Sequence, residues 1–137
     1  MTRRTWLFAV LGVLLERPGF AVIVHPSNHF ETLSRSKLSL LFLRRVSRWP
    51  WGAAVEPVDL VPNEPARVEF ILQVLKTTER DLDQYWIEQT TTRGISRPVQ
   101  VASAAEAKSI VATRPGAIAY IPAADLDRTV KVLKVDP

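Results

Sequence analysis

The chain has 137 residues, of which 47% are hydrophobic and 23% are charged, so it is predicted to fold as one globular domain with a packed core. The formal net charge is +4, but residues 1–21 hold three arginines and one glutamate, and the rest of the chain is close to balance with 15 basic and 13 acidic side chains. This balance argues against a protein built to bind nucleic acid, and the absence of cysteine excludes disulfides, thiolate metal sites and cysteine nucleophiles.

The first 21 residues have the three-part layout of a secretory signal peptide. Arg3 and Arg4 form a short basic region, Trp6–Leu15 is an uncharged apolar run, and Gly19 and Ala21 are small residues near a cleavage site. The apolar run is too short to span a bilayer, which takes about 20 residues. We expect residues 1–21 to be a cleaved signal and residues 22–137 to be one domain in the periplasm or outside the cell, without a membrane span. The alternatives are a membrane-proximal anchor or a buried first helix.

The next part of the chain alternates β-branched runs with amphipathic segments. The expected elements are, in chain order, a strand over Ala21–His25, a helix over Lys37–Arg45 capped by Ser34, a strand over Val55–Leu60, and a helix from Pro65 to about Lys76. In the last of these helices, Val68, Ile71, Leu72 and Leu75 are predicted to form the apolar face.

The second half of the chain continues this alternation. Thr78 with Asp81, and Ser103 with Glu106, have the spacing of capping boxes, and each pair is predicted to begin a helix. The other expected elements are a polar loop over Thr90–Pro98, a strand over Val99–Val101, a helix that ends before Pro115, and strands over Ala117–Ile121 and Thr129–Val135. Alternating strands and helices predict an α/β fold, with a central mixed sheet flanked by helices on both faces.

Three segments of the chain carry motifs of a known family. The first joins AVIVHPSN (residues 21–28) to LSRSKLSLLFLRRVSRW (33–49), the second is VEPVDLVPNEPARVEF (55–70), and the third is ATRPGAIAY (112–120). In this order they resemble the second lobe of the phosphate-binding proteins of bacterial ABC transporters, which have the type 2 periplasmic binding fold. Arg44 and Ala119 stand where that family usually has glycine. The resemblance covers residues 21–137 and is similar in length to short, one-lobe members of the family.

The resemblance implies an anion site at the start of the helix that begins near Pro65, where the family holds phosphate in a loop of Ser-Gly-Thr type. The matching residues here are Asn63, Glu64, Pro65, Ala66 and Arg67. None of them has a hydroxyl group, Pro65 lacks a backbone N–H, and Glu64 brings a negative charge that repels an anion. The family's arginine before this loop aligns with Leu60. We therefore expect weak binding of phosphate or another small oxyanion, unless the loop is only a helix start with Glu64 at the positive end of the helix dipole.

Two further candidate residues for an anion, Arg93 and Arg97, lie in the predicted polar loop. His25 and His29 have the spacing of helical zinc ligands, but Pro26 disfavours a continuous helix there, so no metal site is predicted. No nucleophile motif or cofactor loop is visible either. The sequence therefore predicts a protein that is not an enzyme and uses no cofactor.

A basic and aromatic cluster follows the first predicted helix. It is formed by Arg44, Arg45, Arg48, Trp49 and Trp51. Such a cluster can bind a phosphate-rich polymer or an acidic partner. The alternative is a solvated helix end whose tryptophans pack inward, because cations are favourable at a helix C-terminus.

Two functions are compatible with these observations. The first is an exported solute-binding-like protein that resembles the phosphate-binding component of ABC uptake and has a degenerate anion loop. The second is a ligand-free interaction protein that docks to a membrane sensor or transporter. One lobe buries less of a small ligand than a cleft between two lobes does. If the first function is correct, the affinity for the ligand should therefore be lower than in a two-lobe protein.

Overall fold

The computed structural model describes residues 19–137, so the predicted apolar run of the signal peptide lies outside the described residues. The strands are β1 (Phe20–Val24), β2 (Thr32–Ser34), β3 (Glu56–Leu60), β4 (Val99–Val101), β5 (Ala117–Pro122) and β6 (Lys131–Asp136). The helices are α2 (Arg35–Phe42), α3 (Pro65–Phe70), a π-helical turn η1 (Ile71–Leu75), α4 (Glu79–Arg93), α5 (Ala104–Thr113) and a 3-10 turn η2 (Ala123–Asp125). Among these elements, none is long and apolar enough to cross a membrane.

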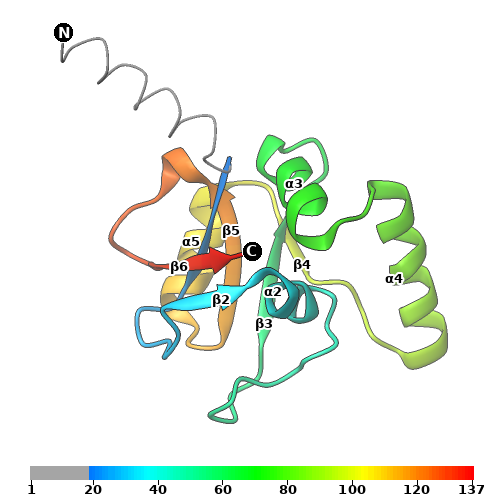
Figure 1. Cartoon of the computed structure of the whole chain (residues 1–137), viewed down its shortest axis with the longest axis horizontal. Helices are drawn as coiled ribbons and strands as arrows, with labels where there is room; N and C mark the ends of the chain where they lie inside the picture. The colour runs from blue at the N-terminus through cyan, green and yellow to red at the C-terminus, as the bar shows by residue number, and fades with distance from the viewer. Residues whose placement is uncertain (1–18) are drawn as a thin grey trace, which may run out of the picture.

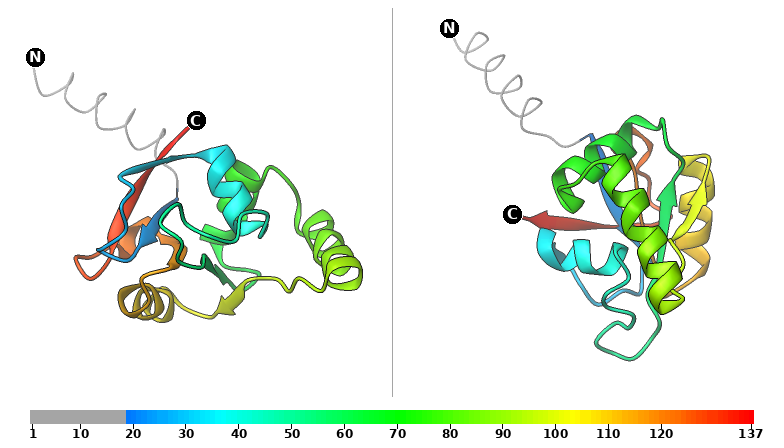
Figure 2. Two further views of the ribbon diagram at one scale, coloured as in Figure 1. Left: turned by 90° about the horizontal axis from the view of Figure 1, so that it is seen from below. Right: turned by 90° about the vertical axis from the view of Figure 1, so that its right-hand side faces the viewer.

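The strands form one mixed sheet in the order β2-β6-β1-β5-β3-β4. The strand β1 runs antiparallel to both of its neighbours, β5 and β6, whereas β3 is parallel to β5 and to β4. Helix α5 covers one face of the sheet, and α2 and α3 cover the other (Figures 1 and 2). The predicted α/β fold, with a mixed sheet between two layers of helices, is therefore confirmed.

The positions of the two central strands, β1 and β5, explain why their sequences are apolar throughout. Val22–Val24 in β1 and Ala117–Ile121 in β5 are buried on both faces, which requires continuous apolar runs rather than alternation. The strand β1 begins at Phe20, whose ring packs edge-on against Phe70 and Tyr120. The domain boundary expected after Ala21 thus falls inside a strand.

The predicted helix starts agree with the structure because their caps are local. The side chains of Ser34, Thr78 and Ser103 accept hydrogen bonds from the backbone N–H groups three residues further on. The predicted helix ends are less accurate. Helix α2 ends at Phe42 rather than at Arg45, because Arg44 adopts a left-handed conformation with φ of 59°. The N–H groups of Arg44 and Arg45 then bond the carbonyls of Leu41 and Leu40, which forms a Schellman motif.

The predicted apolar face of the helix after Pro65 is confirmed for Ile71 and was wrong for Val68 and Leu72. Val68 and Leu72 are more than half exposed, and the buried face is formed by Ala66, Arg67, Phe70, Ile71 and Val74. Two features cause the error. A charged residue, Arg67, lies on the buried face, and the winding changes from α to π after Phe70, which shifts the phase of the later residues.

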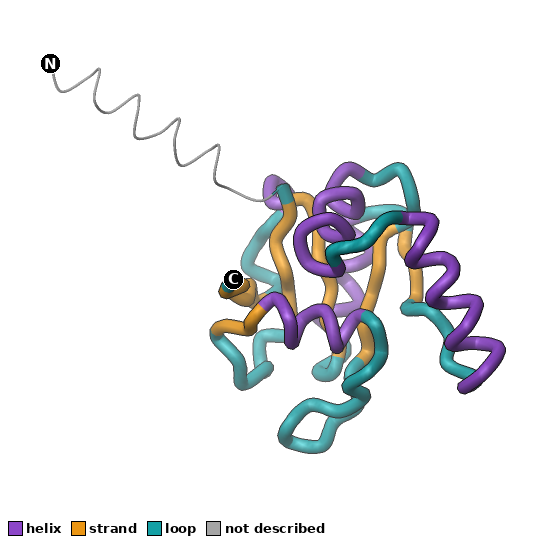
Figure 3. The backbone as a smooth tube through the Cα atoms, turned by 45° about the vertical axis from the view of Figure 1, so that its right-hand side comes forward, coloured by secondary structure: helices purple, strands orange, loops and turns teal. Residues whose placement is uncertain are grey.

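Helix α4 is longer than expected, and its C-terminal part replaces the first half of the polar loop predicted over Thr90–Pro98. The helix runs to Arg93 and ends at Gly94, which has a φ of 66°. It stands at the side of the molecule (Figure 3) and packs through Leu82 and Trp86 against Ile71. The short edge strand β2 was not predicted.

The turn before β5 depends on Gly116. A Cβ atom at this position would lie 2.2 Å from the carbonyl oxygen of Ala54, so no larger residue fits without movement of the backbone. The carbonyl oxygen of Gly116 accepts hydrogen bonds from the indole N–H of Trp49, at 3.0 Å, and from the N–H of Glu56, at 3.0 Å. The Pro-Gly-Ala-Ile segment therefore joins β5 to the loop before β3.

Candidate functional site

The loop between β3 and α3 is the predicted anion site. Asn63 is exposed and left-handed, with φ of 76°, and Glu64 occupies the N-cap position of α3. The carboxylate of Glu64 makes no capping hydrogen bond, although its backbone carbonyl accepts from the N–H of Arg67 at 2.9 Å. Glu64 thus begins the helix through its backbone, and its charge lies at the helix start without a direct partner there.

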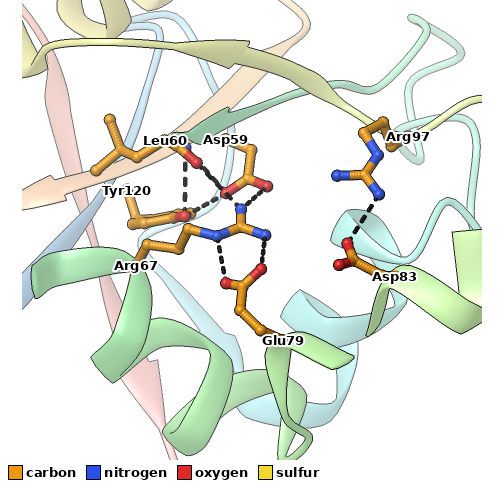
Figure 4. Close-up of polar contacts among 7 residues, drawn as sticks. All are labelled: Asp59, Leu60, Arg67, Glu79, Asp83, Arg97 and Tyr120. Atoms are coloured by element: carbon orange, nitrogen blue, oxygen red, sulfur yellow. Dashed lines mark hydrogen bonds and ion pairs between the residues drawn. The ribbon is translucent and has the colours of Figure 1, made fainter. Parts of the chain in front are cut away.

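Arg67 does not face the loop. Its side chain is 1% exposed and lies between β3 and the start of α4 (Figure 4). Its Nε and Nη2 atoms donate to the two carboxylate oxygens of Glu79 at 2.7 and 2.8 Å, a bidentate contact. Its Nη1 atom donates to Asp59 and, at 3.0 Å, to the carbonyl of Leu60. Arg67 is therefore bound to the protein itself.

Tyr120 completes this buried network. Its hydroxyl group donates to the other carboxylate oxygen of Asp59 and accepts the N–H of Leu60 at 3.3 Å. Burial and the neighbouring charge of Asp59 raise the pKa of Tyr120 above its ordinary value, so the phenol stays protonated as a donor. The ring of Tyr120 stacks on Phe70, with 4.0 Å between centroids.

The charges of this network do not favour a further anion. Burial alone would lower the pKa of Arg67, but the hydrogen bonds and charges of Glu79 and Asp59 outweigh it and hold the pKa above its ordinary value. One cation faces two carboxylates, which gives a formal charge of −1. A second anion about 4 Å from an unbalanced carboxylate would be repelled by about 4 kcal/mol near a protein surface.

The six candidate residues do not converge on one point. Asn63, Glu64 and Ala66 lie at the loop, whereas Arg67 is buried in the network described above. Arg93 is exposed in the last turn of α4. Arg97 bonds Asp83 at 3.0 Å on the surface, beside α4. The role of these residues in ligand binding stays a prediction.

Sequence reasoning missed Asp59, Glu79 and Tyr120. One signal was available, because Asp59 is a carboxylate inside a strand whose neighbours are apolar, and such a group needs a partner. The partner lies 8 residues away in Arg67, and the tyrosine lies 61 residues away. That pairing depends on sheet order, which local patterns do not contain.

The other predicted clusters take structural roles among the described residues. His25 bonds Ser27 at 2.8 Å, and His29 packs on Trp51 with 4.1 Å between centroids. In residues 19–137, no group of three His, Asp or Glu side chains is placed to hold a metal ion. Trp49 is 2% exposed and stacks on Trp51, so the prediction that the tryptophans pack inward is confirmed for Trp49.

The fold of the chain is shared with solved phosphate receptors. The mixed sheet with helices on both faces matches part of each of these structures, which places the likeness in the fold. The chain is similar to an ABC-type phosphate transport receptor from Vibrio cholerae, with a TM-score of 0.68, 18% identity, and coverage of 85% of this chain and 46% of that one. It is also similar to PstS from Borrelia burgdorferi, with a TM-score of 0.66, 12% identity, and coverage of 86% and 47%.

The chain thus spans less than half the length of these two solved structures. The predicted resemblance to phosphate-binding proteins is confirmed as a resemblance of fold. No protein-family model matches the sequence, and no curated protein matches it.

Proposed function

We propose that the chain is an exported solute-binding-like protein of the phosphate-uptake type whose anion loop has degenerated. The proposal includes a signal peptide at the N-terminus, a location in the periplasm or outside the cell, and no enzymatic activity. Its fold and the strand, loop and helix around residues 56–70 support the relationship to phosphate receptors. We infer that the loop has degenerated because Arg67, its only cation, is bonded to other residues of the same chain.

The state of Arg67 carries this proposal. A guanidinium has five N–H donors, and four of those of Arg67 are bonded to Asp59, Glu79 and the carbonyl of Leu60. An anion would have to displace Glu79 to reach this side chain. The remaining loop residues offer neither a hydroxyl group nor a positive charge.

Calorimetric titration of the full chain with phosphate and with sulfate tests the proposal. We expect no binding tighter than about 1 mM, which corresponds to about 4 kcal/mol. Binding in the micromolar range would show that the loop is functional or that the anion binds elsewhere, with the residues around Arg93 and Arg97 as the first place to examine.

A set of variants tests the cause of the weak binding. Glu64→Ser with Pro65→Gly restores a hydroxyl group and a backbone donor, and Glu79→Gln removes the carboxylate charge that competes for Arg67. Since a hydrogen bond to a charged group is worth about 1.5–3 kcal/mol, the triple variant should bind phosphate at least about tenfold more tightly than the double variant. Asp83→Asn in the same double background is the matched control, because Asp83 pairs with the surface residue Arg97. An equal gain in this control would contradict the role of Glu79.

The second candidate function is an interaction protein that docks to a membrane sensor or transporter. The internal pairing of Arg67 favours it, because the position that would attract a small anion is already filled by carboxylates of the same chain. Failure of both the wild-type chain and the triple variant to bind phosphate would favour this function over the first.

A further inference from the structure

Two hollows of about 280 Å³ each lie near the end of α2 and have the residues Leu41, Val46 and Arg48 in common. The first hollow is otherwise lined by Phe30, Leu33, Lys37, Leu40, Trp49 and Pro50. The second is otherwise lined by Arg44, Ser47, Ala54, Val55, Pro57 and Ile95. We call the two hollows together the basic groove. Each hollow is lined mostly by apolar side chains and has cations but no carboxylate in its lining.

The side chains that line the basic groove carry charge of one sign, and the flanking carboxylates of Glu31 and Glu56 pair with Lys131 and Arg114. Residues 35–55 contain five basic side chains and no acidic one, and none of the five lies within ion-pair distance of a carboxylate in the described part of the chain. Of the other ten basic side chains in residues 19–137, five are paired. Three of these unpaired cations, Lys37, Arg44 and Arg48, line the two hollows.

The basic groove is held in shape by the core. The buried indole of Trp49 bonds the carbonyl of Gly116 at 3.0 Å, and Arg48 donates to the carbonyl of Gly52 at 2.8 Å. The backbone over residues 48–54 forms a tight hairpin, in which the N–H of Trp49 bonds the carbonyl of Ala53 at 2.8 Å. A partner would therefore meet a preformed surface, which lowers the entropic cost of binding.

The geometry narrows the kinds of partner that fit. Single-stranded nucleic acid binds by stacking bases on open aromatic faces, but Trp49 is buried and Trp51 is stacked on it. A lipid surface calls for apolar side chains that project outward, whereas most of the apolar groups here line concave hollows. Residues 1–18 carry three arginines and one glutamate, so their charge does not complement the groove either.

We propose that the basic groove docks an acidic segment of a partner protein, which inserts one apolar side chain into each hollow while its carboxylates face Lys37, Arg44 and Arg48. Apolar anchors in small pockets supply the affinity of such contacts, and complementary charge sets orientation and association rate. The inference rests on the second proposed function and assigns its surface. Phosphate titration does not report on the groove, so the two ideas can fail separately.

Fluorescence anisotropy with labelled peptides tests the proposal on the full chain. The probes are short peptides of Glu and Asp that carry two leucines at varied spacing, and the control peptides have serine in place of both leucines. We expect one leucine spacing to bind best, binding to weaken with added salt, and the serine peptide to bind at least about tenfold more weakly, because the anchors supply most of the affinity. Equal binding of the serine peptide would overturn the proposal.

Charge-reversal variants locate the site. Lys37→Glu with Arg44→Glu changes two exposed, unpaired cations of the groove, and Arg128→Glu with Lys134→Glu makes the same charge change at exposed, unpaired positions near β6. We expect the first pair to weaken peptide binding by at least about tenfold and the second pair by less than about threefold, since distant charges are screened. Equal losses would overturn the proposal. The proposal would also be overturned if no peptide binds and the chain instead binds phosphatidylglycerol vesicles, single-stranded DNA or a second copy of itself.

Discussion

Arg67 exposes 1% of its side chain and yet carries a full charge, so its two carboxylate partners decide whether the fold tolerates it. Arg67→Ala would leave Asp59 in the sheet without a cation. We expect a loss of about 3–5 kcal/mol in the free energy of unfolding, because breaking a buried pair leaves an uncompensated charge. Urea denaturation measures this loss. The control is Arg97→Ala, which breaks a surface pair and should cost at most about 1 kcal/mol; similar losses in both variants would argue against the network.

Tyr120 gives the network a response to high pH. Its pKa is raised in the folded protein by burial and by Asp59, whereas in the unfolded chain it titrates near pH 10. The folded state therefore keeps a proton that the unfolded state loses, so the free energy of unfolding should fall as the pH rises above about 10. Denaturation curves at increasing pH should show a smaller fall for Tyr120→Phe. Tyr85→Phe, which removes the other tyrosine of the chain, should retain the wild-type fall. The same slope in all three proteins would contradict this role.

At the scale of single elements, the end of α2 is a site of stored strain. Arg44 is left-handed at the position of a Schellman motif where glycine is favoured, and a left-handed conformation costs other residues about 1–2 kcal/mol. Arg44→Gly should therefore raise the free energy of unfolding by about 0.5–1 kcal/mol, after the greater freedom of glycine in the unfolded chain is counted. Thermal melting checks this expectation. Arg45→Gly, one residue further on, has no positive φ to relieve and should not stabilise the chain.

The turn that leads into β5 should be far less tolerant. Gly116→Ala places a methyl group against the carbonyl of Ala54, and both atoms belong to regions fixed by hydrogen bonds. We expect a loss of about 3 kcal/mol or more in unfolding free energy, at the upper end of overpacking effects. Gly19→Ala is the control, because its new Cβ atom would lie 3.5 Å from Glu69 at ordinary contact distance. A small effect at Gly116 would show that the backbone can move apart.

The elements also show what local sequence can predict. Ser34, Thr78 and Ser103 were identified as caps because each bond joins residues three apart. The buried face of α3 was missed because the reason for burying Arg67 lies in Asp59 and Glu79, on two other elements. The same limit applies to the candidate site, where a loop between a strand and a helix was predicted but the orientation of Arg67 was not predictable from its spacing.

At the scale of the whole molecule, the position of Phe20 bears on where the domain begins. Phe20 opens β1, opposite Pro122, and is 6% exposed. A chain cut after Ala21 would lose this ring, and removal of a buried phenylalanine costs about 3–5 kcal/mol. Chains 20–137 and 22–137 should therefore differ by that amount in chemical denaturation. Equal stability would show that cleavage after Ala21 leaves the fold unharmed, whereas a large difference would show that such cleavage destabilises it.

The order of strands also governs when the fold can form during synthesis. The strand β1 leaves the ribosome first, yet its two neighbours in the sheet are β5 and β6, which are made last. The apolar run of β1 therefore has no partner until residues 117–135 have emerged, and early folding of the N-terminal half is unfavourable. A nascent chain with this topology cannot complete its sheet until β6 has emerged from the ribosome. That delay is compatible with the proposed export, because a membrane translocation channel accepts unfolded chains.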